Sequence, residues 1–336
     1  MKKIVAVISA LLLLALLVFV VKTNPSQQVS PQGKNDTSSK VKPYEGYSFE
    51  KLAERTWKPS LIQIERKIAD YTEYSSYVFF YQSEGRKISG QLNLPNLSRT
   101  MGVVVMARGY VEKEGYKTGV GTKNAADVYA KNGYITLAPD FSGYGESDPE
   151  NSSALAARLT KPVEILDLLA SLRSLPQVDL TKVYLWGHSN GGQIMLSVAE
   201  IIGMQEQMNK NVEYRVRGVT LWAPVSKPFP YNILFYTDEA EDQGKWLRSE
   251  IAKFEVDYDV YKYSIDRYLS NISIPVQIHQ GSADDAVPKK WSDELSKKLE
   301  EDGKIATYYP YPGADHNMKP AWDSVVARDL DFFASN

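Results

Sequence analysis

The sequence contains no cysteine among its 336 residues. This absence excludes disulfide bonds, zinc sites with cysteine ligands and a lipid anchor on an N-terminal cysteine. Histidine is scarce as well: the chain has three, and no two of them have the spacing of a metal-binding helix. So few candidate ligands remain that we expect no metal site.

A dinucleotide cofactor and a nucleic-acid partner also find no support. No G-x-G-x-x-G segment follows the first buried strand, so the chain lacks the glycine-rich turn that binds the pyrophosphate of dinucleotides. The formal net charge is -2 and no long basic run occurs, which argues against a broad surface for nucleic acid. With 43% hydrophobic and 24% charged residues, the composition is that of a globular protein with a sizeable core.

The N-terminus carries a long hydrophobic run. Two lysines precede a segment from Ile4 to Val21 in which Ser9 is the single polar residue. A run of this length just spans a bilayer, so we expect a retained transmembrane helix over residues 1–22, with the rest of the chain anchored outside the cytoplasm. The alternative is a cleaved signal peptide and a secreted protein. Retention is favoured because the run exceeds the usual core of a signal peptide and no small-x-small site follows it.

One folded domain is expected after this segment. Residues 23–45 are rich in Ser, Gln, Asn, Pro and Lys and predict a flexible linker to a domain over residues 46–336. Continuously apolar strands alternate there with helices, which is typical of a mostly parallel α/β sheet covered on both faces. The expected strands are residues 77–81, 88–94, 103–107, 134–139, 182–186, 218–224, 274–279 and 305–309. The expected helices are residues 124–131, 162–175, 193–202 and 321–333.

Residues 225–272 interrupt this alternation. The stretch is rich in Tyr, Phe and Trp and is too long for a plain connection between two strands. It predicts a helical lid inserted into the domain. We expect most of its aromatic rings to pack the lid onto the sheet and a few to line a substrate pocket.

The most specific pattern is Gly187-His188-Ser189-Asn190-Gly191, a G-x-S-x-G sequence between a strand and a helix. A serine in this context lies on a tight, strained turn with its hydroxyl exposed, and glycines flank it because larger side chains have no room. Ser189 is therefore the predicted nucleophile. The N–H of Asn190, at the start of the helix, is placed to donate to an oxyanion.

A serine hydroxyl needs a nearby base to act as a nucleophile. His188 lies within the turn, where its side chain cannot readily reach back to Ser189, and His279 ends an apolar strand, as a packed residue would. His316 lies in a polar loop between the last strand and the last helix. We expect His316 to be the base.

The imidazole needs a carboxylate that fixes its tautomer and stabilises its charged form. The expected chain order is serine, acid, histidine. The loop after the strand at residues 274–279 offers Asp284 and Asp285, and either could serve. Asp315 adjoins His316, and adjacent loop side chains usually diverge, so we expect Asp315 to be an ordinary loop carboxylate.

Four segments, taken in order, resemble the α/β-hydrolase superfamily, and within it the catalytic domain of the prolyl oligopeptidase group with its dipeptidyl aminopeptidase and acylaminoacyl peptidase relatives. They are APDFSGYGES at 138–147, GHSNGG at 187–192, GSADDAVP at 281–288 and GADH at 313–316. The resemblance covers residues 77–333. The first Asp of the family's G-x-x-D-x-x-V-P pattern implies Asp284 as the acid, and its G-x-x-H pattern implies His316 as the base.

Two departures from the family pattern matter. Where relatives have His-Gly after the first long strand, this chain has Arg108-Gly109-Tyr110. A backbone donor does not depend on its side chain, so the amide of Tyr110 is expected to complete the oxyanion hole. Arg108 would either contact a substrate carboxylate or be a surface charge. The stretch before the first strand is also far too short for the β-propeller of true oligopeptidases.

The resemblance implies a serine hydrolase that needs no cofactor and cleaves an ester or peptide bond in a small ester or short peptide. A carboxylesterase or lipase-like enzyme for small acyl esters is the alternative within this class. Acyl transfer to an alcohol or amine is a further possibility, because the fold does not fix the chemistry. A non-catalytic surface binding module is disfavoured, because such proteins usually lose a member of the triad.

Overall fold

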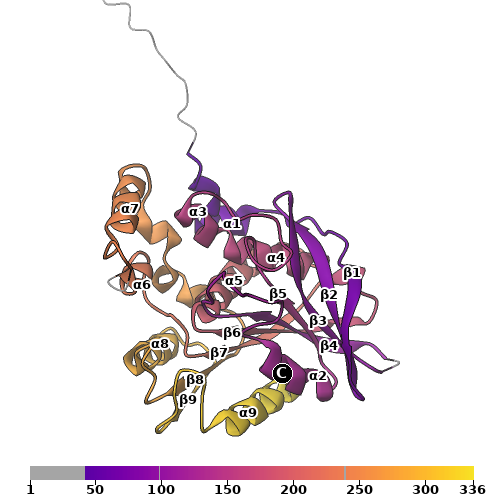
Figure 1. Ribbon diagram of the computed structural model, residues 1–336. Coiled ribbons are helices and arrows are strands. Elements are labelled where there is room, and N and C mark those ends of the chain that lie inside the picture. Colours follow the sequence, from indigo (N-terminus) through magenta and orange to yellow (C-terminus); the bar gives the residue numbers. More distant parts are fainter. Residues whose placement is uncertain (1–41, 98, 238–239) are drawn as a thin grey trace, which may run out of the picture. The chain divides into compact units, whose positions relative to one another are not determined.

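A computed structural model describes residues 42–97, 99–237 and 240–336 (Figure 1). The expected transmembrane helix at residues 1–22 and nearly all of the expected linker lie outside these ranges. Within them, no helix combines the length and the apolar character needed to cross a bilayer. The folded unit extends from Lys42 to Asn336.

In the described part of the chain, nine strands form one sheet in the order β1-β2-β3-β5-β4-β6-β7-β8-β9. Neighbours from β5 to β9 pair in parallel, and β1, β2 and β3 form an antiparallel edge. The expected α/β architecture with a mostly parallel sheet is confirmed. The strands are β1 (Gln63–Asp70), β2 (Tyr74–Ser83), β3 (Arg86–Pro95), β4 (Met101–Ala107), β5 (Ile135–Pro139), β6 (Val178–His188), β7 (Val216–Trp222), β8 (Val276–Gly281) and β9 (Ala306–Tyr311).

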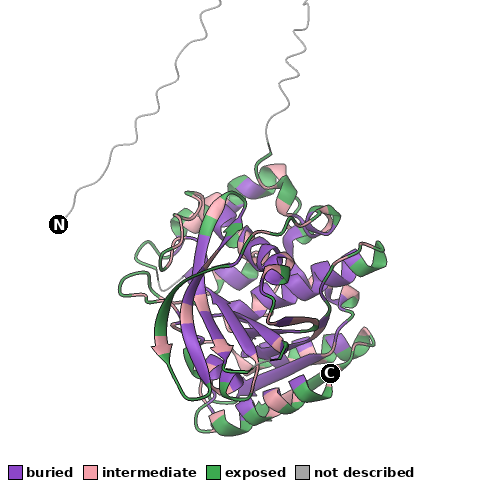
Figure 2. Cartoon of the chain, turned by 90° about the vertical axis from the view of Figure 1, so that its right-hand side faces the viewer, coloured by how far each residue is buried: buried purple, intermediate pink, exposed green. Residues whose placement is uncertain are grey.

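The edge strand β1 is absent from the sequence expectations. Its residues are exposed along nearly the whole strand (Figure 2). Because neither face of β1 is buried, its sequence needs no alternation of apolar and polar residues, and it shows none. Hydrogen bonds to β2 hold it in place. The hairpin of β2 and β3 turns at Glu84 and Gly85 as expected, and both residues have the positive φ that a tight hairpin turn favours.

Helices cover both faces of the sheet (Figure 1). Along β4, Val103, Val105 and Ala107 pack in one core cluster with α4 and α5, whereas Val104 and Met106 pack in another with α2 and α9. Successive residues thus face opposite layers, which explains the uninterrupted apolar run. The helices of the two layers are α1 (Phe49–Glu54), α2 (Lys123–Lys131), α3 (Ala154–Leu159), α4 (Lys161–Ser171), α5 (Asn190–Gln207), α8 (Lys289–Glu301) and α9 (Trp322–Ser335).

A buried carboxylate ties α9 to the sheet. Asp329 of α9 is fully buried and accepts hydrogen bonds from side chains of α2, β7 and β8. The donors are Tyr129 at 2.6 Å, Thr220 at 2.5 Å, Trp222 at 2.9 Å, Gln277 at 3.0 Å and His279 at 3.1 Å. His279 is therefore the packed strand residue that the sequence predicts.

Residues 225–272, called the lid below, are largely helical as expected. They contain α6 (Tyr231–Leu234), α7 (Lys245–Asp257) and the short 3-10 helices η4 (Val260–Tyr263), η5 (Ile265–Arg267) and η6 (Leu269–Asn271). The rings of Phe229, Phe254 and Tyr263 form a cluster of their own with Leu155 of α3. This cluster contains no strand residue, so the expectation that most lid rings pack on the sheet is wrong for these rings.

The first residues of the folded unit fasten the lid to α3. The N–H of Tyr44 donates to the Tyr258 hydroxyl at 3.2 Å, and the Tyr263 hydroxyl donates to the Tyr44 carbonyl oxygen at 3.1 Å. The Tyr44 hydroxyl is hydrogen-bonded to the Ser153 hydroxyl at 2.7 Å, and Ser153 is the N-cap of α3. One residue thus contacts both elements.

Glu200 lies within α5 and is fully buried, and neither carboxylate oxygen has a hydrogen-bond partner among the described residues. Burial raises the pKa of Glu200 well above the usual value, and the charge of Asp266 adds to this effect. The folded protein therefore keeps Glu200 protonated under conditions in which the unfolded chain ionises it.

Replacing Glu200 with methionine is expected to raise the free energy of unfolding by about 1 kcal/mol near pH 4 and about 3 kcal/mol near pH 8. As pH rises above the usual glutamate pKa, the unfolded state loses a proton that the folded state keeps, so Glu200 lowers stability progressively. Methionine removes the polar group and still fills the space. Urea unfolding at both pH values measures the gain, with Glu206→Met at an exposed site of α5 as control. A gain that does not grow with pH contradicts this account.

Candidate active site

Ser189 stands at the turn between β6 and α5. Its backbone angles, φ 57° and ψ -121°, are unusual for a residue with a side chain, and such strain persists only where the surroundings fix it. The Ser189 N–H donates to the Trp222 carbonyl oxygen at 2.8 Å, and its carbonyl oxygen accepts from the N–H of Val225 at 3.0 Å. The neighbouring β7 segment therefore holds the turn on both sides.

The glycines of the turn are required by close backbone contacts. A Cβ atom on Gly187 would lie 2.5 Å from the carbonyl oxygen of Gly191. A Cβ atom on Gly191 would lie 2.0 Å from the carbonyl oxygen of Ala107, at the end of β4. Both distances are shorter than any real contact, so the structure bears out the steric reason for G-x-S-x-G.

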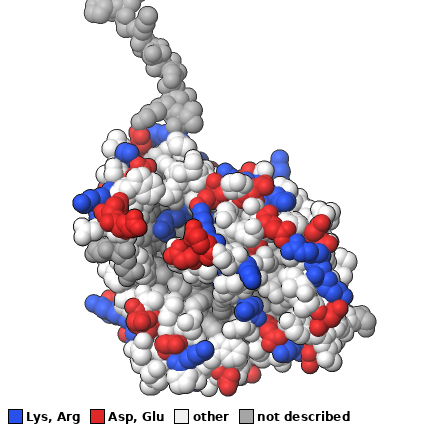
Figure 3. Space-filling view, viewed as in Figure 1, with Lys and Arg blue, Asp and Glu red and all other residues white. Residues whose placement is uncertain are grey.

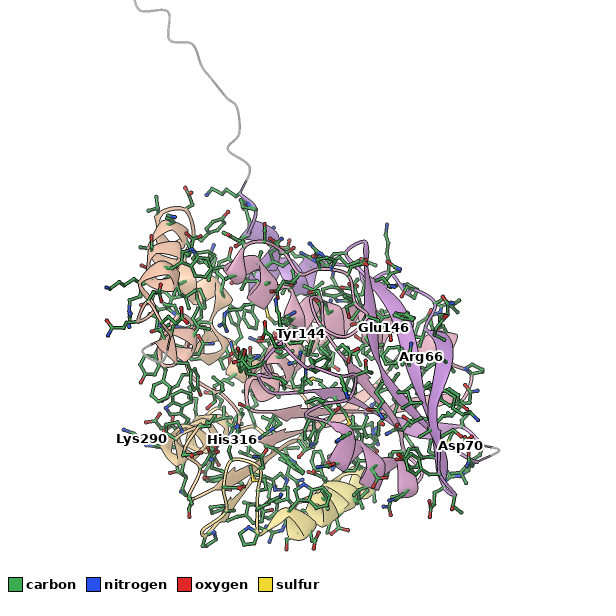
Figure 4. All side chains as sticks on the ribbon, viewed as in Figure 1. Arg66, Asp70, Tyr144, Glu146, Lys290 and His316 are labelled. Atoms are coloured by element: carbon green, nitrogen blue, oxygen red, sulfur yellow. The ribbon has the colours of Figure 1, made fainter. Side chains whose placement is uncertain are left out.

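The structure brings His316 and Asp284 together. His316 lies in the loop between β9 and α9 (Figure 4), and its Nδ1 donates to the two carboxylate oxygens of Asp284 at 3.0 and 2.9 Å. The side chain of Asp284 has no exposed surface. Because Nδ1 carries the proton in this bond, Nε2 of the neutral ring is left free to accept one.

Several donors fix the Asp284 carboxylate. They are the N–H groups of Ala286 at 2.9 Å and Val287 at 2.8 Å and the Gln280 side-chain amide at 2.9 Å. Burial raises the pKa of Asp284, but the hydrogen bonds from His316, Val287 and Gln280 outweigh burial and hold the pKa below its usual value. The carboxyl is therefore ionised when it faces the imidazole.

The other two candidate carboxylates lie apart from this contact. Asp285 is exposed, in contrast to its neighbour Asp284. Asp315 accepts hydrogen bonds from the N–H groups of Asn317 at 2.9 Å and Lys319 at 2.8 Å, as an ordinary loop carboxylate does. Of the two acids that sequence reasoning left open, the geometry favours Asp284.

His188 makes a contact that sequence reasoning missed. Its Nε2 donates to the carbonyl oxygen of His316 at 2.9 Å, and the two rings lie 4.6 Å apart. Burial, and to a smaller extent the nearby His316, lowers the pKa of His188 to about 4, so the ring is neutral near pH 7. A neutral ring next to Ser189 thus links the serine turn directly to the histidine loop.

The loop after β4 passes close to Ser189. A Cβ atom on Gly109 would lie 3.0 Å from Cβ of Ser189, so a larger residue here would crowd the nucleophile. The next amide in the chain is that of Tyr110. The N–H of Asn190 belongs to the first turn of α5, where helical N–H groups have no acceptor within the helix. The two amides that the sequence predicts for an oxyanion hole thus belong to the two segments next to Ser189.

Arg108 supports this loop from inside the protein. It is 6% exposed and donates to the carbonyl oxygens of Gly109 at 2.9 Å and Asp140 at 3.0 Å. Its guanidinium lies 4.0 Å from the ring centre of Tyr144, which Figure 4 labels, in a cation–π contact. The interpretation of Arg108 as a surface charge is therefore wrong.

A cavity of about 440 Å³ opens beside the nucleophile, and Tyr110 and Asn190 are among its lining residues. From the lid, Phe229, Asn232, Ile233 and Tyr263 line it, so these are the lid rings and side chains that face a pocket. On the face shown in Figure 3, cationic side chains lie within a hollow and acidic side chains gather at its edge. Among the described residues, no group of three His, Cys, Asp or Glu could hold a metal ion.

Residues 121–336 match the family model described as the prolyl oligopeptidase family. No sequence among the curated proteins is significantly similar to the chain.

Solved structures share the fold. An acetyl xylan esterase from Paenibacillus sp. R4 has a TM-score of 0.63 at 18% identity, over 84% of this chain and 91% of that one. Acetyl xylan esterase 1 from Thermoanaerobacterium sp. JW/SL YS485 has a TM-score of 0.60 at 14% identity, over 86% and 92%. Dipeptidyl peptidase 4 of Porphyromonas gingivalis has a TM-score of 0.57 at 16% identity, over 79% of this chain and 36% of that one.

Proposed function

This chain belongs to the prolyl oligopeptidase family and is a serine hydrolase, and from this premise we propose that Ser189, His316 and Asp284 form its catalytic triad. One observation carries the proposal: the Nδ1–H of His316 bonds to a buried carboxylate, while the residue next to Ser189 bonds to the backbone of His316. Three segments distant in sequence thereby meet at one edge of the sheet.

In the proposed reaction the Ser189 hydroxyl attacks the carbonyl carbon of an ester or amide, and Nε2 of His316 takes the hydroxyl proton. The ionised Asp284 stabilises the imidazolium that forms. The N–H groups of Asn190 and Tyr110 bind the oxyanion, and each accounts for roughly 3 kcal/mol of the barrier. His316 then gives its proton to the leaving group, which leaves an acyl group on Ser189.

Water resolves the acyl-enzyme by the reverse sequence. His316 removes a proton from water as the oxygen attacks the acyl carbon, and it returns that proton to Ser189 Oγ as the acid product departs. The family description supports a peptide bond, and the solved esterases with the same fold support an ester. An alcohol or amine in place of water would make the same site an acyltransferase.

A fluorophosphonate probe tests the assignment. We expect the protein from Lys42 to Asn336 to be labelled, the Ser189→Ala variant to remain unlabelled, and Ser152→Ala, at an exposed serine, to be labelled normally. Labelling of Ser189→Ala would refute the triad. A folded protein that turns over neither p-nitrophenyl esters nor aminoacyl nitroanilides would favour the binding-module alternative.

For the N-terminus, the run from Ile4 to Val21 supports a membrane anchor that leaves the hydrolase domain outside the cytoplasm. In cells that express the full chain, the protein should then stay in the membrane fraction after carbonate extraction. Release into the medium with a shortened N-terminus would instead support a cleaved signal peptide.

A further inference from the structure

The cavity beside Ser189 lies on the acyl side of the proposed reaction. Tyr110 and Asn190, which hold the oxyanion, are among its lining residues, whereas His316 and the rest of its loop are not. The histidine must protonate the leaving group, so the leaving group sits next to His316. The part of the substrate that remains on Ser189 is thus left to occupy the cavity. This step rests on the proposed function.

The walls of the cavity are mostly apolar and follow one face of α5. The lining residues of α5 extend from Asn190 to Ile201, which is about 16 Å along the helix axis. Helices α1 and α3 and the lid supply the opposite walls. Their apolar lining residues include Phe49, Leu52, Leu155, Leu159, Phe229 and Ile233. Such a cavity suits the hydrocarbon part of an acyl group.

Most charged groups of the cavity have protein partners. Lys113 forms an ion pair with Glu150. Arg108 donates to two backbone carbonyl oxygens, and Lys161 donates to the Ser142 carbonyl oxygen at 3.1 Å and lies 4.0 Å from Glu164. Glu112 and Glu114 line the cavity from an exposed loop and so lie at its mouth.

Arg158 of α3 differs from these groups. It lines the cavity, yet it forms no hydrogen bond or ion pair with any residue that the structure describes. Desolvation by the surrounding residues lowers the pKa of Arg158. The electrostatic effect of Tyr110, Glu150 and Tyr144 raises the pKa but is smaller. An arginine stays charged even so. Arg158 is an exposed residue, so its N–H donors are open to solvent and to a ligand.

Asn232 is a second group without a partner. It lines the same cavity from α6 and is 2% exposed, and neither its Nδ2 nor its Oδ1 has a hydrogen-bond partner among the described residues. A buried amide left unpaired on both atoms is costly, but neither atom has accessible surface, so a ligand in the cavity reaches them only if neighbouring side chains move.

We propose that the acyl group of the substrate is a hydrocarbon chain that carries a carboxylate, and that Arg158 binds this carboxylate at the cavity. Arginine suits this role because its planar fork donates two parallel hydrogen bonds to a carboxylate. Arg158 is then a specificity-determining residue: it selects anionic acyl groups over neutral ones and takes no part in bond breaking.

Matched substrates test the proposal directly. One is the mono-4-nitrophenyl ester of adipic acid, and the other is its methyl ester, which differs only in having no charge. For the wild type we expect kcat/KM to be about 10- to 100-fold higher for the charged ester, the range of a hydrogen bond between charged groups. Arg158→Met should reduce the ratio to about one, and Arg158→Lys should keep part of it. Arg173→Met, at an exposed arginine paired with Glu213, should keep the wild-type ratio.

The outcomes separate this inference from the proposed function. If the wild type hydrolyses the neutral ester through Ser189 but shows no preference for the charged one, the inference fails and the triad stands. If Arg158→Met keeps the preference, another group binds the carboxylate and the inference fails. A preference for aminoacyl nitroanilides with a free amine would also overturn it, because Glu112 and Glu114 would then bind a cationic group of the substrate. Turnover of either ester by Ser189→Ala would refute the triad itself.

Discussion

Asp284→Asn is expected to lower kcat by about 10,000-fold. In the wild type, Oδ1 of Asp284 accepts from the N–H groups of Ala286 and Val287. The amide oxygen of an asparagine would take that position, which turns its NH2 group toward His316. The imidazole would then accept at Nδ1 and carry its proton on Nε2. A ring in that tautomer cannot take a proton from the serine, and the new NH2 group also faces the Gln280 amide that donates to Oδ2 in the wild type.

The neighbouring acid provides the control for this prediction. Asp285→Asn changes the same kind of group at the adjacent, exposed position, and we expect its kcat to stay within about twofold of the wild type. Steady-state hydrolysis of p-nitrophenyl acetate measures both variants, and thermal unfolding shows whether Asp284→Asn remains folded. A large loss in Asp285→Asn with little loss in Asp284→Asn would move the catalytic acid by one residue.

Asp329→Asn is expected to lower the free energy of unfolding by about 3–5 kcal/mol. The carboxylate of Asp329 accepts hydrogen bonds from five side chains and is fully buried. An asparagine puts an NH2 group where one of the accepting oxygens was. At least one of the buried donors then faces another donor and loses its partner without gaining water. The contact between α9 and the sheet would weaken accordingly.

Urea unfolding measures this loss as a shift of the midpoint with an unchanged slope. Asp331→Asn is the matched control, because Asp331 is exposed on the same helix, and its effect should remain within about 0.5 kcal/mol. A loss below about 1 kcal/mol in Asp329→Asn would mean that the five donors find other partners.

The sequence predicts those features of the fold that depend on neighbours along the chain. The apolar runs that became β4, β6, β7 and β8, the hairpin at Glu84 and the glycine turn around Ser189 all have local signals. Strand β1 has none, because pairing with β2 creates it rather than any pattern of its own. The packing of lid rings on α3 is likewise a contact between distant segments.

The same division applies to the site. The flanking glycines identify Ser189 from the sequence, but no local sequence signal distinguishes Asp284 from Asp285 as the catalytic acid. They differ in what surrounds them in three dimensions: Asp284 is covered and receives several donors, whereas Asp285 faces solvent. The hydrogen bond from His188 to the His316 carbonyl oxygen joins segments 128 residues apart, so no local sequence pattern predicts it.

The hydrogen bonds of Tyr44 to the lid and to Ser153 matter for the design of truncated versions of this protein. A recombinant version that begins at Ser48 would keep every strand and all three side chains of the proposed triad. It would nevertheless lose the hydrogen bonds that hold Tyr258 and Tyr263 to the cap of α3. The lid residues that line the cavity would then be free to shift. Shortening the chain by a few residues would therefore change which molecules enter the cavity, in addition to any effect on purification.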